Sequence, residues 1–397
     1  MASDSGRKRL LVLGAGPAQL GLLEAARKRG LYTIAVDRDP AAPGFALADR
    51  RAIISTEDER GIERLAGAER VDGVIAPGID WPVGIAARVA AKLGIRHPLE
   101  PAVAGLAVSK ARQRERFAAA GVPQPRWRLV SEADDGLPLP CVVKAPDRQG
   151  QRGLSVVRDK HELRRAIERA IEASRTDFAV VEELVDGPEL TVNAFSLDGD
   201  FHPLTVTDRI TAEPPAFGVA LAHVWPAEAN ADAAAEAAGQ AVEALGIRNG
   251  PTYAQVRTGP EGPHVMEVAA RLGGGHDAEL CEAALGVDLN GLALAAALGV
   301  DISPPDPRPR VGGACTVFLV PPPGELLGFE GVEDAQRTEG VVAVRLYRRP
   351  GFRFGELRVG ADRAGAVQAV GGNRAEAYER ARAAAALIRF QTDAALV

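Results

Sequence analysis

Two stretches decide the fold of this chain: VEELVDGPELTV at residues 181–192 and VMEVAARLGGG at residues 265–275. In the second stretch, Glu267 lies inside an apolar run that reads as a strand, where an unpaired carboxylate would be costly to bury. A cation and the neighbouring Arg271 would relieve that cost. Because Mg²⁺ is commonly held by one or two carboxylates together with substrate phosphates, the pattern favours a magnesium site at Glu267.

A third motif lies upstream of these two. Lys144 ends the apolar run Cys141–Lys144, and the loop QGQRGLS at residues 149–155 leads into the next apolar run. A lysine beside a glycine-rich loop suits phosphates, since backbone N–H groups and a point charge neutralise anionic oxygens. Taken alone, a lysine at a strand end is most often a solvated residue, so the prediction depends on the order of all three motifs.

In that order the motifs resemble those of the ATP-grasp superfamily, and the stretch 181–192 resembles the hinge of D-alanine–D-alanine ligases. The resemblance implies a role for each matching residue. Glu182, Glu183 and Val185 would frame adenine, and Glu189 would bind the ribose. Lys110 and Lys144 would bind the phosphates under a lid loop that includes Gln149, Gly150, Gly153 and Ser155. Gln255 and Glu267 would hold Mg²⁺, and Arg271 and Lys144 would be catalytic, with Arg271 facing the transferring phosphoryl group or acyl phosphate.

Two positions depart from the pattern of that superfamily. Gln255 stands where many relatives have the first metal-binding carboxylate, although carbamoyl phosphate synthetases use glutamine there. Ala269 stands where many relatives have a metal-binding asparagine. The second departure leaves open how many Mg²⁺ ions the site holds, but it does not affect the expectation of ATP binding.

The first hundred residues alternate between predicted strands and helices, which implies a parallel sheet with helices on its faces. The turn Gly14-Ala15-Gly16 follows a strand as in a dinucleotide fingerprint, but the third glycine, Gly21, comes two residues too late. The predicted fold class is therefore α/β, an ATP-grasp fold with a Rossmann-like domain that binds no NAD. The expected domains are the Rossmann-like domain at 1–105, the ATP-grasp domain at 106–303 with a small α+β lid subdomain at about 141–188, and a C-terminal α+β lobe at 310–397 beyond a proline cluster.

Four residues between and after the main motifs are candidates for substrate binding. They occupy stretches that face the acceptor pocket in relatives, with a surface salt bridge or an ordinary polar histidine as the alternative reading. These residues are Asp208, Arg209, His223 and His276. The basic run of Arg345, Arg348, Arg349 and Arg353 reads instead as a solvated strand face.

The resemblance implies an ATP-dependent, ADP-forming carboxylate–amine ligase similar to the L-amino acid ligases, with ATP and Mg²⁺ and with a small-molecule carboxylate and amine as substrates. Three alternatives stay open. One is a carboxylating enzyme like N5-carboxyaminoimidazole ribonucleotide synthetase, one is a Rossmann oxidoreductase, and one is a non-catalytic ATP-binding sensor motivated by Gln255 and Ala269. The oligomeric state also stays open, with a homodimer among the possibilities.

Composition limits the partners and the compartment. The net charge of −6 argues against a nucleic-acid partner, because duplex binders usually carry a basic surplus. No apolar run approaches about 18 residues, so no membrane partner is expected. The N-terminal stretch has too short an apolar run for a signal peptide, and the three cysteines are widely spaced, so we expect a cytoplasmic protein with free thiols.

Overall fold

A computed structural model of the 397-residue chain describes residues 6–132, 139–214 and 216–393. Residues 1–5 of the N-terminal stretch considered above lie outside the described residues. Four parallel strands form the first sheet, in the order β3-β2-β1-β4, as the alternating pattern predicted. The elements are β1 (Arg9–Leu13), α1 (Leu20–Lys28), β2 (Tyr32–Asp37), β3 (Arg50–Ile53), α2 (Glu59–Glu69), β4 (Gly73–Ile75) and α3 (Trp81–Leu93), with short 3₁₀ turns at Pro17–Gln19 and Pro43–Ala46.

A small antiparallel sheet with one helix follows, in the order β5-β8-β6-β7. Two helices lead into it, α4 (Pro101–Ala107) and α5 (Lys110–Ala120), and its elements are β5 (Trp127–Val130), β6 (Cys141–Lys144), β7 (Ser155–Val157), α6 (Lys160–Ala173) and β8 (Ala179–Glu183). The helix packs its apolar stripe of Leu163, Ala166, Ile167 and Ala170 on the sheet. Strand β5, which precedes the expected lid subdomain at about 141–188, pairs with β8 and so belongs to the same sheet.

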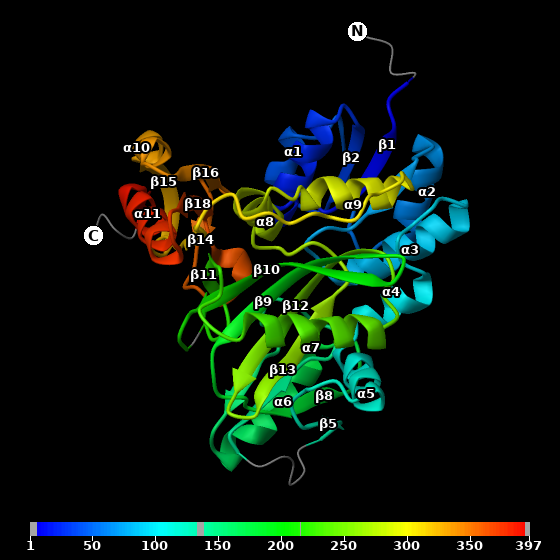
Figure 1. The fold of residues 1–397 in the computed structure, drawn as a ribbon, viewed down its shortest axis with the longest axis vertical. Helices are drawn as coiled ribbons and strands as arrows, with labels where there is room; N and C mark the ends of the chain where they lie inside the picture. The colour runs from blue at the N-terminus through cyan, green and yellow to red at the C-terminus, as the bar shows by residue number, and fades with distance from the viewer. Residues whose placement is uncertain (1–5, 133–138, 215, 394–397) are drawn as a thin grey trace.

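An eight-stranded antiparallel sheet forms the centre of the molecule, in the order β13-β12-β9-β10-β11-β14-β18-β16 (Figure 1). Its strands are β9 (Glu189–Leu197), β10 (Asp200–Thr211), β11 (Ala220–Trp225), β12 (Gly250–Gly259), β13 (Gly262–Ala269), β14 (Gly313–Leu319), β16 (Val341–Leu346) and β18 (Gly365–Gly371). Helices α7 (Ala231–Ala244), α8 (Asp277–Leu285), α9 (Leu289–Leu298), α10 (Val332–Arg337) and α11 (Arg374–Leu387) pack around it.

Three strands of the expected C-terminal lobe belong to the central sheet. Its strands β14, β18 and β16 continue the central sheet, since β14 pairs with β11 along residues 314–317. Only a short three-stranded sheet, β17-β15-β19, is separate; it consists of β15 (Gly324–Glu330), β17 (Arg353–Phe354) and β19 (Arg389–Thr392), and a 3₁₀ turn lies at Gly360–Asp362. The lobe therefore forms part of the wall of any cavity beside the central sheet.

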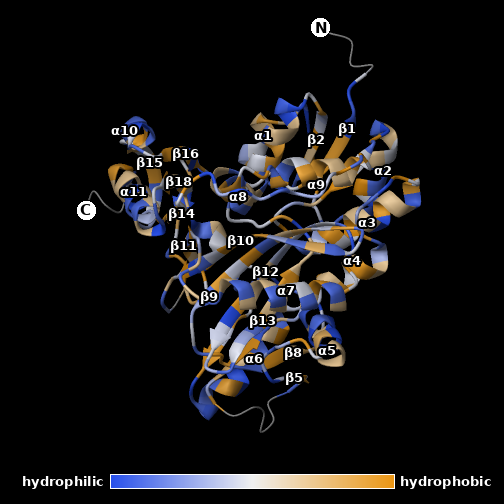
Figure 2. Ribbon diagram, viewed as in Figure 1, coloured by the Kyte–Doolittle hydropathy of each residue, from blue (hydrophilic) through white to orange (hydrophobic). Residues whose placement is uncertain are grey.

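The hydrophobic core joins the first domain to the central sheet. Helix α9 packs against α1 and β4 of the first domain and against β12 of the central sheet. Figure 2 shows α9 as a largely hydrophobic helix between these layers. Buried residues of β1, such as Leu10 and Val12, belong to the same cluster as Leu289 and Leu294 of α9. This shared core fixes the loops of the first domain beside the central sheet.

Within the described ranges, no single helix has the length and apolarity needed to cross a bilayer. Helices α8 and α9 meet those criteria only when taken together, and they are bent by 119° relative to one another.

Candidate active site

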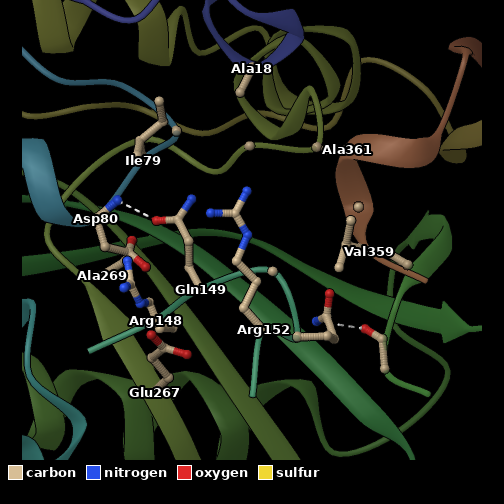
Figure 3. Close-up of a pocket in the computed structure, with 18 of the residues that line it drawn as sticks. Ala18, Ile79, Asp80, Arg148, Gln149, Arg152, Glu267, Ala269, Val359 and Ala361 are labelled. Carbon is tan, nitrogen blue, oxygen red and sulfur yellow. Dashed lines mark hydrogen bonds between the residues drawn. The ribbon is translucent and has the colours of Figure 1, made fainter. Parts of the chain in front are cut away.

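A cavity of about 660 Å³ lies where the first domain, the lid subdomain, the central sheet and the C-terminal lobe meet. Figure 3 shows side chains from these parts converging on it: Asp80 from the first domain, Gln149 and Arg152 from the lid loop, Glu267 from β13, and Val359 and Ala361 from the C-terminal lobe. Of the residues predicted from the sequence, the structure brings eleven to its walls. These are Lys110, Lys144, Gln149, Gly150, Glu182, Glu189, Arg209, His223, Gln255, Glu267 and Arg271.

Lys110 and Glu267 form an ion pair on the floor of the cavity. Ser109 caps α5 and places Lys110 at its first residue, with Lys110 Nζ 2.8 Å from Glu267 Oε1 and 2.7 Å from the carbonyl oxygen of Arg148. Burial opposes both charges, but the attraction outweighs it, so the pKa of Lys110 is raised and that of Glu267 is lowered. The negative charge of Glu267, which would be costly to bury alone, is thus compensated by Lys110, a predicted phosphate-binding residue.

Lys144 is buried, which sets it apart from an ordinary solvated lysine at a strand end. Its Nζ lies 2.7 Å from Glu182 Oε2, and Arg114 Nε donates to Glu182 Oε1 at 2.7 Å. Burial, with the positive charges of Arg114 and Lys110, lowers the pKa of Lys144 although Glu182 raises it. Two cations share one carboxylate here, so a positive charge stays available for an anionic ligand.

Arg114 is a residue of this cluster that the sequence analysis missed. It lies on α5 and is fully buried, and it also donates to the carbonyl oxygens of Val265 and Met266 on β13. It therefore ties the helix that carries Lys110 to the strand that carries Glu267. An arginine in a helix otherwise rich in arginine gives no signal that separates it from a solvated face.

Gln255 and Glu267 lie opposite one another as paired residues of β12 and β13. A carboxylate and an amide oxygen are ligands that Mg²⁺ accepts beside phosphate oxygens, so these two residues fit the predicted ion. Across the described ranges no three His, Cys, Asp or Glu side chains are grouped to hold a metal ion. A metal ion at Glu267 would therefore need further oxygen ligands from bound phosphates.

Arg271 follows β13 and is paired with Asp80, a residue that the sequence analysis did not single out. The Arg271 guanidinium lies 2.7 Å from Asp80 Oδ1 and 5.2 Å from the centre of the Tyr253 ring. The backbone N–H of Asp80 donates to the side chain of Gln149 in the lid loop. Asp80 lies beyond the carboxyl end of β4, where α/β sheets commonly bind ligands, and this position is the signal that could have found it.

The lid loop reaches the cavity through residues 149–152 and Leu154. Gln149 and Gly150 line the cavity, and Gln151 Nε2 donates to the carbonyl oxygen of Gly218 at 3.1 Å. Gly153 lies behind the wall with φ +70°, where a Cβ would come 2.7 Å from that of Ala173. Ser155 also lies outside the wall, and its hydroxyl accepts a hydrogen bond from Arg169.

The hinge residues are divided between the cavity and the surface. Glu183 pairs with Arg126 at 2.7 Å and Val185 packs against Gly259, so neither side chain lines the cavity. Glu189, the predicted ribose ligand, lines it but is paired with Arg209 and with Arg257. A ribose would meet a carboxylate already engaged by two guanidinium groups.

Only two of the four candidate substrate residues line the cavity. Arg209 and His223 line the cavity, whereas Asp208 pairs with Arg374 and the buried His276 contacts the Tyr347 hydroxyl at 2.6 Å. Burial lowers the pKa of His223 to about 4 and that of His276 to about 3. Both imidazoles are therefore neutral near pH 7, and His223 offers a neutral nitrogen to a ligand.

The N-terminal glycine turn is filled by the protein itself. Gln19 is buried and donates to the carbonyl oxygen of Pro77, and a Cβ at Gly14 would lie 2.8 Å from the Gln19 side chain. Asp37 Oδ2 accepts from the backbone N–H of Ala15 at 2.9 Å. The turn that resembled a dinucleotide fingerprint is thus held by internal contacts, which disfavours the oxidoreductase alternative.

Comparison with known proteins identifies the class. A family model for the ATP-grasp domain matches residues 137–279, and the model for the L-amino acid ligase C-terminal domain 2 matches residues 317–393. Residues 137–279 therefore form an ATP-grasp domain. Residues 317–393 are similar to the C-terminal domain of the L-amino acid ligases, and the homologues with these domains are ATP-binding, ADP-forming carbon–nitrogen ligases.

Individual relatives resemble the chain in fold or in sequence over most of its length. The solved L-amino acid ligase of Bacillus licheniformis superimposes with a TM-score of 0.83 at 21% identity, covering 98% of this chain and 100% of that chain. The formate-dependent phosphoribosylglycinamide formyltransferase of Burkholderia vietnamiensis is 28% identical over 407 residues, covering 96% of this chain and 95% of the relative. Protein y4rH of Sinorhizobium fredii is 27% identical over 383 residues, covering 89% and 77%. The predicted fold class is confirmed.

Proposed function

We propose that this enzyme activates the carboxylate of an amino acid as an acyl phosphate and condenses it with an amine, releasing ADP and phosphate. One observation carries the proposal: Lys110, Lys144, Gln255, Glu267 and Arg271 line a single cavity under the lid loop. Such a set binds the phosphates of ATP and leaves further space for a carboxylate and an amine.

The reaction proceeds in two steps. An oxygen of the substrate carboxylate attacks the γ-phosphorus of ATP, which forms the acyl phosphate and breaks the bond to the leaving ADP oxygen. The amine nitrogen then attacks the acyl carbon, loses a proton and expels inorganic phosphate as the amide forms. Little covalent chemistry falls to the protein, so positioning and charge neutralisation dominate.

The residues of the cavity take distinct parts in this scheme. Lys110 and Lys144 neutralise phosphate oxygens, and Arg271 stabilises the charge on the transferring phosphoryl group. Glu267 and Gln255 would hold Mg²⁺, which supplies further charge neutralisation when bound. The lid loop excludes water that would hydrolyse the acyl phosphate.

A substrate screen tests the proposal. The full-length protein is incubated with ATP, Mg²⁺ and pairs of amino acids, and phosphate release and amide product are measured. Phosphate release that depends on one amino acid, with a matching amide, supports the proposal. Turnover with bicarbonate and an amine in place of an amino acid would favour the carboxylating alternative, and ATP binding without acid-dependent turnover would favour the sensor.

A further inference from the structure

The cavity carries a charge opposite to that of the molecule. Eleven cationic and seven anionic side chains line it, whereas the whole chain has a net charge of −6. Three of the seven carboxylates are paired with cations at the nucleotide end: Glu267 with Lys110, Glu182 with Lys144 and Asp80 with Arg271. The wall formed by the C-terminal lobe adds cations and no carboxylate within the described residues.

Arg363 is the central cation of that wall. Its Nε donates to the carbonyl oxygen of Gly360 at 2.8 Å and its Nη1 to that of Ala220 at 3.2 Å. The guanidinium carbon lies 3.7 Å from the centre of the Phe318 ring, which fixes the plane of the group. In the part of the chain that the structure describes, no carboxylate forms an ion pair with Arg363. Two of its nitrogens are thus used for positioning, and its charge has no counterion.

Arg348 lies beside Arg363 on the same wall. It was expected on a solvated strand face, but it lines the cavity and donates to the carbonyl oxygen of Ala361 at 3.5 Å. Its neighbour Arg349 is exposed and does not line the cavity. The expectation of a solvated face therefore fits Arg349 and is wrong for Arg348.

Gly360 keeps the face of Arg363 open. A Cβ at this position would lie 3.2 Å from Nη2 of Arg363, tighter than most real Cβ contacts. The backbone of Gly360 is outside the left-handed region, so an alanine would meet this contact without backbone strain. The missing side chain leaves room for a ligand at the nitrogen that makes no hydrogen bond to a carbonyl oxygen.

The surroundings make this position favourable for an anion. Burial lowers the pKa of Arg363, and the positive charge of Arg209 acts in the same direction. A negatively charged ligand group would relieve both effects, and a guanidinium can bind a carboxylate or a phosphate through two nitrogens. Figure 3 shows Val359 and Ala361, next to this position, across the cavity from Glu267, so such a group would be separate from the ATP phosphates.

We propose that Arg363, with Arg348 beside it, binds a second anionic group of a substrate, a carboxylate or a phosphate that takes no part in the reaction. The inference rests on the proposed function, because it assumes that a substrate occupies this end of the cavity. It deepens that function by naming the substrate class: an acid or an amine that carries an additional negative charge.

Binding measurements with matched probes test the subsite. The full-length protein with Mg²⁺ and a non-hydrolysable ATP analogue is titrated with L-aspartate against L-asparagine, and with O-phospho-L-serine against L-serine. The wild type should bind one anionic probe at least about tenfold more tightly than its neutral partner. Arg363→Gln and Gly360→Ala should each reduce that preference by about fivefold or more, while the exposed control Arg349→Gln should retain it. The pair that shows the preference distinguishes a carboxylate from a phosphate.

The same experiment separates the subsite from the proposed function. Wild-type protein that shows no preference in either pair, or a preference that Arg363→Gln and Gly360→Ala leave intact, would overturn the subsite. Acid-dependent ADP formation is measured alongside with each probe. Its absence would contradict the proposed function, whereas an anion preference that depends on Arg363 would still support the subsite.

Discussion

Each predicted phosphate-binding cation of this site is already paired with a carboxylate of the protein. Lys144 and Arg114 share Glu182, and Lys110 faces Glu267. A buried ion pair offsets desolvation only when its geometry is good, and removing one partner leaves the other uncompensated. ATP phosphates can therefore replace the carboxylates as partners of the lysines, and a metal ion can replace Lys110 as the partner of Glu267, without leaving a buried charge uncompensated.

The charge of Lys144 should be essential for turnover. Lys144→Met keeps the hydrophobic stem but removes the charge, and we expect ADP formation to fall by at least about a hundredfold. Glu182 keeps Arg114 as a partner, so the variant should still fold, as circular dichroism can show. Lys160→Met, at an exposed position on α6, is the matched control. Near-normal turnover in Lys144→Met would show that the phosphates lie elsewhere.

The two predicted metal ligands should respond differently to substitution. Glu267→Gln should lower Mg²⁺-dependent turnover by at least about a hundredfold, because it removes a charge that is positioned for the transition state. Gln255→Glu should be tolerated better, since it restores the carboxylate that is commoner among relatives. ADP formation measured across a range of Mg²⁺ concentrations checks both. The reverse order of effects would contradict the assigned roles.

His223 should make the protein less stable in acid. Its folded-state pKa is about 4, below the ordinary value of 6.5, so the unfolded chain takes up a proton first as the pH falls. The stabilisation is therefore present above about pH 6.5 and is lost as the pH falls towards 4, by about 2 kcal/mol between pH 7 and pH 5.

Chemical denaturation of the wild type and His223→Gln at both pH values checks this prediction. The loss of unfolding free energy on acidification should be smaller in His223→Gln. His276 has the same sign of effect, so part of the loss should persist. The exposed His161→Gln serves as control and should behave as the wild type. An equal loss in His223→Gln and the wild type would refute the buried neutral state of His223.

The sequence alone identified those site residues whose charge is unusual for the segment in which they lie. Glu267 in an apolar strand and Lys144 before a glycine-rich loop were predicted for that reason, and both line the cavity. Asp80, Arg114 and Arg363 were missed because their local sequence is ordinary for a loop, a helix or a strand start. Their role depends on contacts with residues between 68 and 191 positions away, which no local pattern contains.

At the scale of elements, local chemistry explains where several helices begin and end. The side chains of Ser109, Asp159 and Asn373 cap α5, α6 and α11, and Gly121 follows the last residue of α5. The hinge between β8 and β9 depends on a close approach of two backbones. Gly187 has φ +142°, and a Cβ there would lie 2.0 Å from the carbonyl oxygen of Thr258 on β12.

Gly187→Ala should therefore destabilise the protein more than a glycine substitution that meets only backbone strain. Gly121 also has a positive φ, +69°, but a Cβ there would meet nothing within 4 Å, so Gly121→Ala is the matched control. We expect Gly187→Ala to lose about 1–3 kcal/mol more unfolding free energy than Gly121→Ala. Equal losses in denaturant titrations would show that the hinge can move away from β12.

At the scale of the whole molecule, the sequence predicted the parallel first sheet but not the extent of the central one. Alternating strands and helices define neighbours along the chain, so the first sheet follows from local patterns. The pairing of β11 with β14 joins residues about ninety positions apart across the proline-rich segment, which reads as a domain boundary. That pairing brings Arg348 and Arg363 to the cavity, so the substrate end of the site could not be predicted from the sequence.

The central claim is that the enzyme phosphorylates a carboxylate with the γ-phosphate of ATP. The most direct test is to incubate the protein with ATP, Mg²⁺, an amino-acid panel and hydroxylamine, and to separate the nucleotides by chromatography. We predict ADP and phosphate in equal amounts, with a hydroxamate from one donor acid, because hydroxylamine intercepts an acyl phosphate. AMP as the main product, with a matching amount of pyrophosphate, would contradict the claim.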